Sequence, residues 1–252
     1  MRQLGLIGKS LSHSFSKSYF EEKFHREQIS DVSYSLFELA EIEHITDFIR
    51  HHPDLVGFNV TIPYKQQIIP YLDELSEEAE TIRAVNTVVV KHTGGQIITK
   101  GFNTDITGFR NSLQGSSIPD CALILGTGGA AAAVKYVLEQ ARCRCTVISR
   151  DPNKGLPYSA LTQNIIAQHK LIVNCTPVGT YPSINEKPDI PYEGISGDHF
   201  LYDLVYNPEI TAFLKEGIQR GAKTMNGLAM LHAQAEKSWE LFQINVNTTH
   251  NS

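Results

Sequence analysis

The chain has 252 residues, of which 41% are hydrophobic and 19% are charged, and its formal net charge is −5 at pH 7. This is enough apolar material to fill the core of one large domain or of two medium ones. An acidic balance without a basic stripe does not suit phosphate neutralisation, so we expect no nucleic-acid partner.

The N-terminal segment MRQLGLIGKSLSHSFSK turns polar after Ile7. It lacks the apolar core of a signal peptide, and no later stretch is apolar enough to span a bilayer. The four cysteines show neither zinc-type nor thioredoxin-type spacing and are expected to be reduced thiols. We therefore expect a cytoplasmic protein without a membrane partner or a metal site.

Short apolar runs alternate with helical patterns along the whole chain. The first half contains the runs LGLI, SYSLFEL, VGFNVTI and VNTVVV, with SKSYFEEKFHRE and SEEAETIRAV as helical segments. The second half contains CALIL, CTVIS, LIVNCT and FLYDLVY, with AAAAVKYVLEQAR and PEITAFLKEGIQRG as helical segments. Such alternation predicts parallel sheets covered by helices.

A change of character separates the two halves. The helix-like TDITGFRNSLQ is followed by the turn-rich GSSIPD and then by a new strand. We predict one α/β domain over residues 1–106 and a second over residues 107–226. The remaining segment, residues 227–252, is predicted to be a helix that packs back on the first domain.

The segment CALILGTGGAAAAVKYVLEQ reads as a buried strand, a glycine-rich turn and a helix, the order in which a βαβ unit binds a pyrophosphate. Glycines let the backbone turn tightly, and the free N–H groups of the helix N-terminus attract phosphate charge. The pattern is GxGxxA, and similar turns also occur without a ligand. The expected contacts are Gly126, Thr127, Gly128, Gly129 and Ala130.

The next strand ends at Ser149, Arg150 and Asp151, where an NAD enzyme usually carries an acid for the ribose 2′-hydroxyl. A guanidinium suits a 2′-phosphate, so Arg150 favours NADP, with Lys154 as a helper and Ser149 as a further expected cofactor contact. Asp151 leaves the opposite interpretation open, because a carboxylate repels that phosphate. Solvated loop charges are the third alternative.

Several motifs together resemble the shikimate dehydrogenase family over nearly the whole chain. They are GKSLSHSFSKSYF, GFNVTIPYK, AVNTVV, GFNTDITGF, GTGGA, NCTPVG, YDLVYNP and NGLAMLHAQA. The resemblance implies an N-terminal α/β substrate domain and a Rossmann-like NADP-binding domain, with the active site in the interdomain cleft. It also implies NADPH-dependent reduction of 3-dehydroshikimate to shikimate, a step of chorismate and aromatic amino acid biosynthesis. Lys9-Ser10 and Ser16-Lys17 depart from the Asn-Pro and Ser-Pro of many members.

The resemblance also implies a set of site residues. Ser14, Ser16 and Tyr206 would bind the substrate carboxylate, and Asn59, Thr61, Asn86 and Gln234 would line the pocket for ring hydroxyls. On the cofactor side it adds Thr176, Leu204 and Gly227. Neutral hydroxyl and amide groups suit a small polyhydroxylated acid. Each has a structural alternative, such as a helix cap for the serines or a strand-end polar group for Asn59 and Thr61.

Lys65 and Asp105 are the candidate catalytic pair. A dehydrogenase must move a proton to or from the substrate oxygen, and the resemblance assigns this work to Lys65, with Asp105 accepting a hydrogen bond from the same hydroxyl. An ammonium group there also stabilises a developing oxyanion. The structural alternatives are a surface lysine and a helix N-cap.

Two rival functions remain open at this stage. One is a quinate or mixed quinate/shikimate dehydrogenase that uses NAD, and the other is a non-catalytic sensor that keeps the ligand pocket. Retention of both Lys65 and Asp105 argues against the sensor. The expected assembly is a monomer or a homodimer.

Overall fold

The computed structural model describes residues 1–11 and 14–248, which form two compact units. Unit 1 comprises Met1–Thr104 and the chain from Ala235 onward, and unit 2 comprises Asp105–Gln234. The divisions that we predicted follow residues 106 and 226. Within the described residues, no helix combines the length and apolar character needed to cross a membrane.

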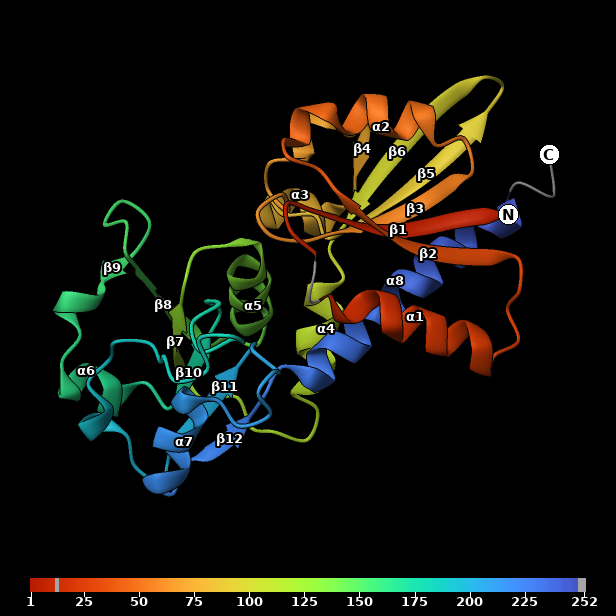
Figure 1. Ribbon diagram of the computed structural model, residues 1–252. Coiled ribbons are helices and arrows are strands. Elements are labelled where there is room, and N and C mark those ends of the chain that lie inside the picture. The colour runs from red at the N-terminus through yellow and green to blue at the C-terminus, as the bar shows by residue number, and fades with distance from the viewer. Residues whose placement is uncertain (12–13, 249–252) are drawn as a thin grey trace. The chain divides into compact units, whose positions relative to one another are not determined.

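Unit 1 is built on a six-stranded sheet in the order β2-β1-β3-β5-β6-β4 (Figure 1). Its strands are β1 (Arg2–Gly8), β2 (Val32–Glu38), β3 (Leu55–Val60), β4 (Glu74–Leu75), β5 (Thr87–Thr93) and β6 (Gln96–Phe102). Strands β1, β2 and β3 are parallel, whereas β5 is antiparallel to both β3 and β6. The prediction of a parallel sheet is therefore wrong for the β5–β6 hairpin, where Gly94 and Gly95 adopt φ of 57° and 80° and allow a tight turn.

Helices cover both faces of this sheet. They are α1 (Phe15–Arg26), α2 (Ile45–His51), α3 (Glu77–Ile82) and, from Ala235 on, α8 (Leu228–Thr248), with 3₁₀ turns η1 (Ile42–His44) and η2 (Ile69–Tyr71). Successive strand side chains point to opposite faces. Leu6 of β1 accordingly packs in the core under α1 and α8, and Ile7 in the core under α2 and α3.

The second part of α8 lies in the unit 1 core, on the same face as α1 (Figure 1). The Trp239 and Phe24 ring centroids are 5.3 Å apart. A Cβ on Gly57 of β3 would lie 2.5 Å from a ring carbon of Phe242, so only glycine admits this aromatic ring over the strand. The close fit fixes the position of α8 on the sheet.

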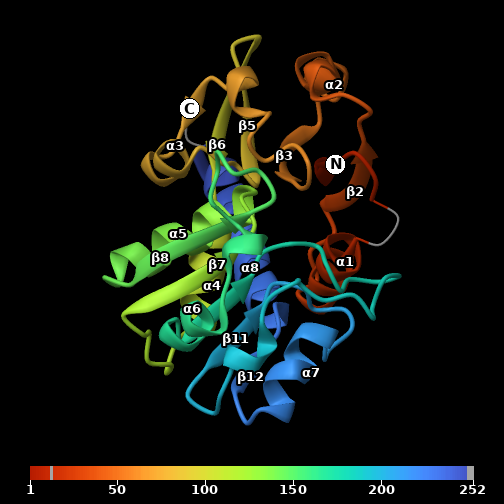
Figure 2. The same ribbon diagram turned by 90° about the vertical axis from the view of Figure 1, so that its left-hand side faces the viewer.

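Unit 2 contains an all-parallel six-stranded sheet in the order β12-β11-β10-β7-β8-β9. Its strands are β7 (Cys121–Leu125), β8 (Arg144–Ser149), β9 (Leu156–Pro157), β10 (Leu171–Asn174), β11 (Phe200–Asp203) and β12 (Lys223–Met225). Its helices are α4 (Asp105–Ser112), α5 (Gly129–Gln140), α6 (Gln163–Gln168), α7 (Ala212–Gln219) and the start of α8, with η3 (Tyr158–Ala160) and η4 (Tyr192–Gly194). Figure 2 shows α7 beside β12. This doubly wound arrangement confirms the Rossmann-like prediction.

Candidate active site

Four strand ends meet at one edge of the unit 1 sheet. The parallel strands β1 and β3 end together, with Ile7 paired to Val60. Strand β5 begins at this edge, with Thr87 opposite both Asn59 and Phe102, the last residue of β6. The predicted substrate residues Ser14, Ser16, Asn59, Thr61 and Asn86 and the predicted catalytic Lys65 lie at these strand ends or on the segments next to them.

Ser14 and Ser16 lie at the start of α1 and are half-buried. The Ser14 Oγ accepts a hydrogen bond from the Ser16 backbone N–H at 3.3 Å, so Ser14 is the N-cap of the helix. Ser16 donates a hydrogen bond to the Tyr34 hydroxyl, which itself donates to Asn59, and burial raises the pKa of Tyr34. A cap bond uses only an oxygen lone pair of Ser14, so its hydroxyl hydrogen can still be donated to a carboxylate. Capping and ligand binding are compatible here.

Thr61 and Lys65 lie in the turn that follows β3. The Thr61 N–H donates to the Ile7 carbonyl at 3.0 Å, and the Lys65 carbonyl accepts from the Val85 N–H at 2.7 Å. Buried Tyr64 anchors the turn, because its hydroxyl donates a hydrogen bond shared by the carbonyls of residues 39 and 40. These bonds place half-buried Lys65 beside Val85, which directly precedes Asn86 in the sequence.

Asn86 is buried, with 2% of its surface exposed, and its orientation is defined by its oxygen. The Oδ1 atom accepts hydrogen bonds from the Thr104 N–H at 2.7 Å, the Thr104 hydroxyl at 3.1 Å and the Thr87 hydroxyl at 3.1 Å. The amide nitrogen is therefore the Asn86 group that can donate to a ligand oxygen. Thr104 is followed directly by Asp105, the first residue of α4, which is 5% exposed.

Asn59 differs from the other predicted pocket residues. Its Oδ1 accepts from the Tyr34 hydroxyl at 2.9 Å, and its Nδ2 donates to the Ser238 hydroxyl at 2.9 Å and to the Thr87 hydroxyl at 3.0 Å. Both amide hydrogens are thus donated within the protein. This geometry favours a structural position over the direct substrate contact that the resemblance implied.

Tyr206 and Gln234, the other predicted substrate residues, lie in unit 2. Tyr206 follows β11, and burial raises the pKa of its hydroxyl. Gln234 lies on α8, where its Nε2 donates to the Leu231 carbonyl at 2.9 Å. A Cβ on Gly108 of α4 would lie 2.7 Å from the Met230 carbonyl oxygen, so α4 and α8 pack backbone to backbone at this level.

The glycine turn of unit 2 has the features that a phosphate site needs. Gly126 has a φ of 113°, a region that disfavours side chains, and a Cβ there would approach the Thr176 methyl group to 3.2 Å. Gly128 is the N-cap of the 12-residue α5, and no atom lies within 4 Å of where its Cβ would be. Open backbone N–H groups at a helix N-terminus favour an anion. Thr127, Gly129 and Ala130 surround this point of the turn.

The loop after β8 gives Arg150 and Asp151 different surroundings. The Asp151 Oδ1 accepts from the backbone N–H of Asn153 at 3.0 Å and from its amide at 3.2 Å. Its Oδ2 lies 3.9 Å from the Lys154 Nζ. The Asp151 N–H in turn donates to the buried Ser149 hydroxyl at 3.0 Å. Asp151 is thus engaged by its own turn, whereas Arg150 is exposed.

A buried acid that we did not predict supports the neighbouring cofactor loop. Asp203, fully buried at the end of β11, accepts hydrogen bonds from Asn174 at 2.9 Å and Thr211 at 2.6 Å. Burial raises its pKa to about 6, against the lowering effect of these bonds. The Asn174 Oδ1 accepts from the Thr176 hydroxyl at 2.6 Å and backbone N–H at 3.0 Å. Asp203 therefore positions Thr176 through Asn174.

Leu204 and Gly227, the remaining cofactor candidates, are in direct contact. A Cβ on Gly227 would lie 2.1 Å from the Leu204 carbonyl oxygen, and the Gly227 N–H donates to the Val205 carbonyl at 3.3 Å. No side chain fits at position 227 without moving the backbone after β11. Both residues were expected from the family resemblance, and this contact is the physical reason for the glycine.

The polar side chains behind the unit 1 edge were also missed. Tyr34, Thr87, Thr104 and Ser238 are all at most 3% exposed and hydrogen-bond the predicted pocket residues. A usable signal existed only for Ser238, which lies one helical turn after Gln234 and hence on the same face of α8. Within the described residues, no group of three or more His, Cys, Asp or Glu is arranged to hold a metal ion.

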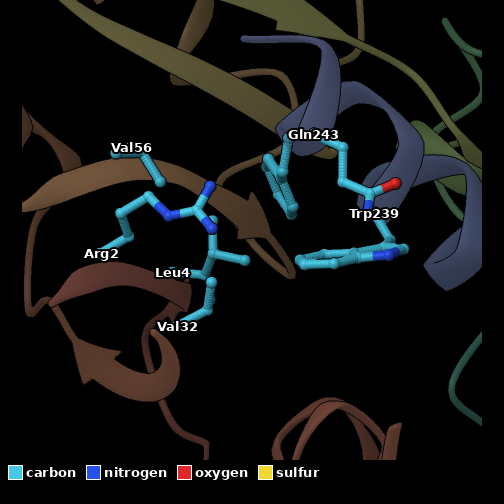
Figure 3. A pocket seen from close by; sticks show the side chains of 7 residues that line it. Arg2, Leu4, Val32, Val56, Trp239 and Gln243 are labelled. Carbon is cyan, nitrogen blue, oxygen red and sulfur yellow. The ribbon is translucent and has the colours of Figure 1, made fainter. Parts of the chain in front are cut away.

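A small apolar cavity in unit 1 is separate from these residues (Figure 3). It is lined by Arg2, Leu4, Val32, Val56, Trp239, Phe242 and Gln243, and its volume is about 10 Å³. That is the smallest space that holds one water molecule. Its strand residues lie at the amino end of β1 and β2, away from the edge where the site residues gather.

Comparison with known proteins agrees with this arrangement. Residues 6–88 match the model of the shikimate dehydrogenase substrate binding domain. A shikimate dehydrogenase (NADP(+)) of Caldicellulosiruptor saccharolyticus is 38% identical over 262 aligned residues, covering 95% of this chain and 92% of that enzyme. The shikimate 5-dehydrogenase of Thermus thermophilus in complex with NADP(H) and shikimate has a TM-score of 0.83 and 30% identity, covering 96% and 93% of the two chains. The quinate dehydrogenase of Corynebacterium glutamicum in complex with NAD also has a TM-score of 0.83, with 28% identity and the same coverage. The relatives named shikimate dehydrogenase extend over nearly the full chain, and the chain therefore belongs to the shikimate dehydrogenase family.

Proposed function

We propose that this protein catalyses the reversible NADPH-dependent reduction of 3-dehydroshikimate to shikimate, in the biosynthesis of chorismate and the aromatic amino acids. The observation that carries the proposal is the single edge of the unit 1 sheet. There Ser14, Ser16, Thr61 and Lys65 follow strands that end together, and Asn86 directly precedes the strand that begins beside them. The family relatives named for this activity support the assignment.

The proposed substrate contacts follow from the hydrogen-bonding capacity of each side chain. Ser14 donates its hydroxyl hydrogen to the substrate carboxylate, with Tyr206 as a further donor. Ser16 completes the carboxylate site by turning its single hydroxyl hydrogen from Tyr34 to the carboxylate. Asn86 donates from its nitrogen, because its oxygen is held by Thr104 and Thr87. Thr61 and Gln234 complete the recognition of ring hydroxyls. These neutral groups bind a polyol without the desolvation cost of additional charges.

Lys65 and Asp105 are the proposed catalytic residues. Lys65 donates a proton to the substrate carbonyl oxygen during reduction and accepts it back during oxidation, and its ammonium form stabilises negative charge on that oxygen. Asp105 accepts a hydrogen bond from the same hydroxyl and orients it. The hydrogen bonds from Val85 to the Lys65 carbonyl and from Thr104 to Asn86 hold the backbone on either side of this pair.

When bound, NADPH would supply the hydride for reduction and NADP⁺ would accept it in the reverse direction, which protein side chains cannot do. The residues present fit this cofactor. Gly126 and Gly128 open the backbone of the turn before α5, and Arg150 offers an exposed guanidinium for the 2′-phosphate. Lys154 offsets the charge of Asp151. Thr176, held by Asn174, and the Leu204–Gly227 contact complete the proposed cofactor residues.

A second candidate is a dehydrogenase that prefers quinate with NAD. The structural likeness to a quinate dehydrogenase bound to NAD and the presence of Asp151 favour it. Against it, the Asp151 carboxylate accepts two hydrogen bonds from Asn153 and pairs with Lys154. A carboxylate held in this way is less available to a ribose hydroxyl.

A four-way spectrophotometric assay tests the proposal. Purified protein is mixed with shikimate or quinate, each with NADP or NAD, and reduction of the nicotinamide is followed by absorbance. We expect the highest kcat/KM with shikimate and NADP. The highest kcat/KM with quinate and NAD would establish the second candidate instead, and a preference for quinate alone or for NAD alone would overturn the substrate or the cofactor part of the proposal.

The location and assembly of the enzyme are part of the same proposal. All four cysteines are free thiols, the state that a reducing compartment maintains, which supports the cytoplasm. We propose a monomer or a homodimer. Light scattering coupled to gel filtration measures the mass directly, and a mass above two chains would contradict this assignment.

A further inference from the structure

A connected group of buried polar side chains lies behind the substrate edge of unit 1. Its members are Tyr34, Asn59, Asn86, Thr87, Thr104 and Ser238, whose exposed fractions run from 0% to 7%. They come from β2, β3, the start of β5, the end of β6 and α8. We call this group the amide network.

The hydrogens of the amide network can be assigned a direction. The Asn59 Nδ2 must donate, and it does so to the hydroxyls of Ser238 and Thr87. The Asn86 Oδ1 must accept, and it receives the hydroxyls of Thr87 and Thr104. Ser238 and Thr104, 3.1 Å apart, connect the two amides by a second route. Two paths therefore run from the Asn59 nitrogen to the Asn86 oxygen.

This polarity determines which end of the Asn86 amide a ligand meets. If the amide were turned over, its NH₂ group would face the Thr104 N–H, which is also a donor. Two buried donors facing each other leave both without an acceptor, which is unfavourable. The amide network thus holds the oxygen inward and presents the nitrogen as a donor to a substrate oxygen.

We propose that Ser238, Thr87 and Asn59 are positioning residues that set the orientation of Asn86 and the position of Thr104, and thereby of the Asp105 that follows it. This inference rests on the proposed function, because its effect is on a shikimate site. It also assigns Asn59 a role through Asn86, in place of direct contact with the substrate. Ser238 connects α8 to the network, because its hydroxyl lies 2.9 Å from the Asn59 Nδ2, 2.9 Å from the Thr87 hydroxyl and 3.1 Å from the Thr104 hydroxyl.

The test compares buried hydroxyls within unit 1. Ser238→Ala and Thr87→Val each interrupt one path, and Thr87→Ser keeps the Thr87 hydroxyl while losing its methyl group. Thr99→Val is the matched control. Thr99 on β6 is 4% exposed, and its hydroxyl donates to Asp73 at 2.8 Å and accepts from the Asp73 N–H at 3.1 Å, outside the amide network.

The measurements are kcat and KM for shikimate, KM for NADP, and thermal unfolding with and without shikimate. All kinetics are measured well below the unfolding temperature of the least stable variant. Misplacing a reacting group by about 1 Å can cost about a hundredfold in rate. We expect Ser238→Ala and Thr87→Val to lower kcat/KM for shikimate by about tenfold to a hundredfold with little change in KM for NADP.

Thr99→Val also removes a buried hydroxyl and is expected to lower the unfolding temperature about as much as Ser238→Ala and Thr87→Val do. It should keep kcat/KM for shikimate within about twofold of wild type, because its hydroxyl bonds Asp73 outside the amide network. Thr87→Ser is expected to recover most of the activity that Thr87→Val loses. Should Ser238→Ala and Thr87→Val behave like Thr99→Val, the positioning role is overturned while the proposed function stands. If wild-type protein fails to oxidise shikimate with NADP, both the function and this inference are overturned.

Discussion

The two candidate half-sites offer different kinds of chemical group to a ligand. At the unit 1 edge, side-chain hydroxyls and amides are held from behind by the amide network. At the unit 2 turn, glycines expose the backbone, as the open space beside Gly128 shows. Polyols need donors and acceptors in defined directions, whereas a pyrophosphate needs several N–H groups and close approach.

The difference also separates neutral from charged support. The unit 1 network contains no carboxylate, so protonation does not alter its bonds near neutral pH. In unit 2, the hydrogen bonds that hold Asn174 and Thr211 depend on the buried carboxylate of Asp203. Variants on the two sides should therefore differ in which substrate they affect and in how they respond to pH.

The largest expected effect is on turnover at the unit 1 edge. Lys65→Ala should lower kcat by about 10²–10⁴-fold, with modest changes in KM for shikimate and NADP, because proton transfer acts in the transition state. Steady-state kinetics with a thermal-unfolding check measure this. Lys91→Ala, an exposed lysine on β5, is the control and should retain wild-type turnover. A folded Lys65→Ala protein with near-normal kcat contradicts the proposed mechanism.

The second prediction concerns the charged support in unit 2. Burial raises the pKa of Asp203 to about 6, above its ordinary value of 3.8. The folded state thus binds this proton more tightly, and the stability it contributes is present below pH 3.8 and is lost as pH rises through about 6. The free energy of unfolding of wild type relative to Asp203→Asn should decrease by up to about 3 kcal/mol between pH 4 and pH 7.

Denaturant unfolding at both pH values measures this difference. Asp198→Asn, which changes an exposed carboxylate of the same unit, provides the control and should show little dependence on pH. If the wild type gains stability relative to Asp203→Asn on raising the pH, the buried carboxylate is stabilised in its charged form and our description of it is wrong.

The third prediction concerns how Arg150 of unit 2 distinguishes NADP from NAD. Arg150→Ala should weaken NADP binding by about ten- to a hundredfold, because a charge-assisted contact to phosphate contributes about 1.5–3 kcal/mol, and it should leave NAD binding nearly unchanged. Fluorescence titration of both cofactors measures the two Kd values. Lys135→Ala removes an exposed cation of α5 as a control for general charge effects. Equal weakening of NADP and NAD would show that Arg150 does not read the 2′-phosphate.

The smallest expected effect distinguishes capping from ligand binding. Ser14→Ala and Ser76→Ala each remove an N-cap whose hydroxyl oxygen accepts a backbone N–H at 3.3 Å, from α1 and α3 respectively. Each should cost about 1 kcal/mol of stability. Only Ser14→Ala should also raise KM for shikimate, and steady-state kinetics measure this increase. An unchanged KM would leave Ser14 with the capping role alone.

Much of this molecule was predictable from local patterns. Alternating apolar runs and helical segments predicted the α/β class, and the doubly wound sheet and the NADP assignment are confirmed. Motif order identified the family, and most site residues follow strand ends that the apolar runs had located. The hairpin from β5 to β6 was missed because QIITKGF is short and partly polar, so its pattern gives only a weak strand signal.

The sequence by itself determined which chemical groups are available and near which strand ends they lie, because periodicity and turn residues act over a few positions. Only the tertiary structure decided how the polar groups pair. Ser238 meets Asn59 across 179 positions of sequence, and Asn86 meets Thr104 across 18. Such pairing depends on strand order and on the packing of α8, which local sequence does not encode. The same long-range pairing places Asn59, which we predicted to contact the ligand, in the amide network, because both of its amide hydrogens meet hydroxyls brought there by β5 and α8.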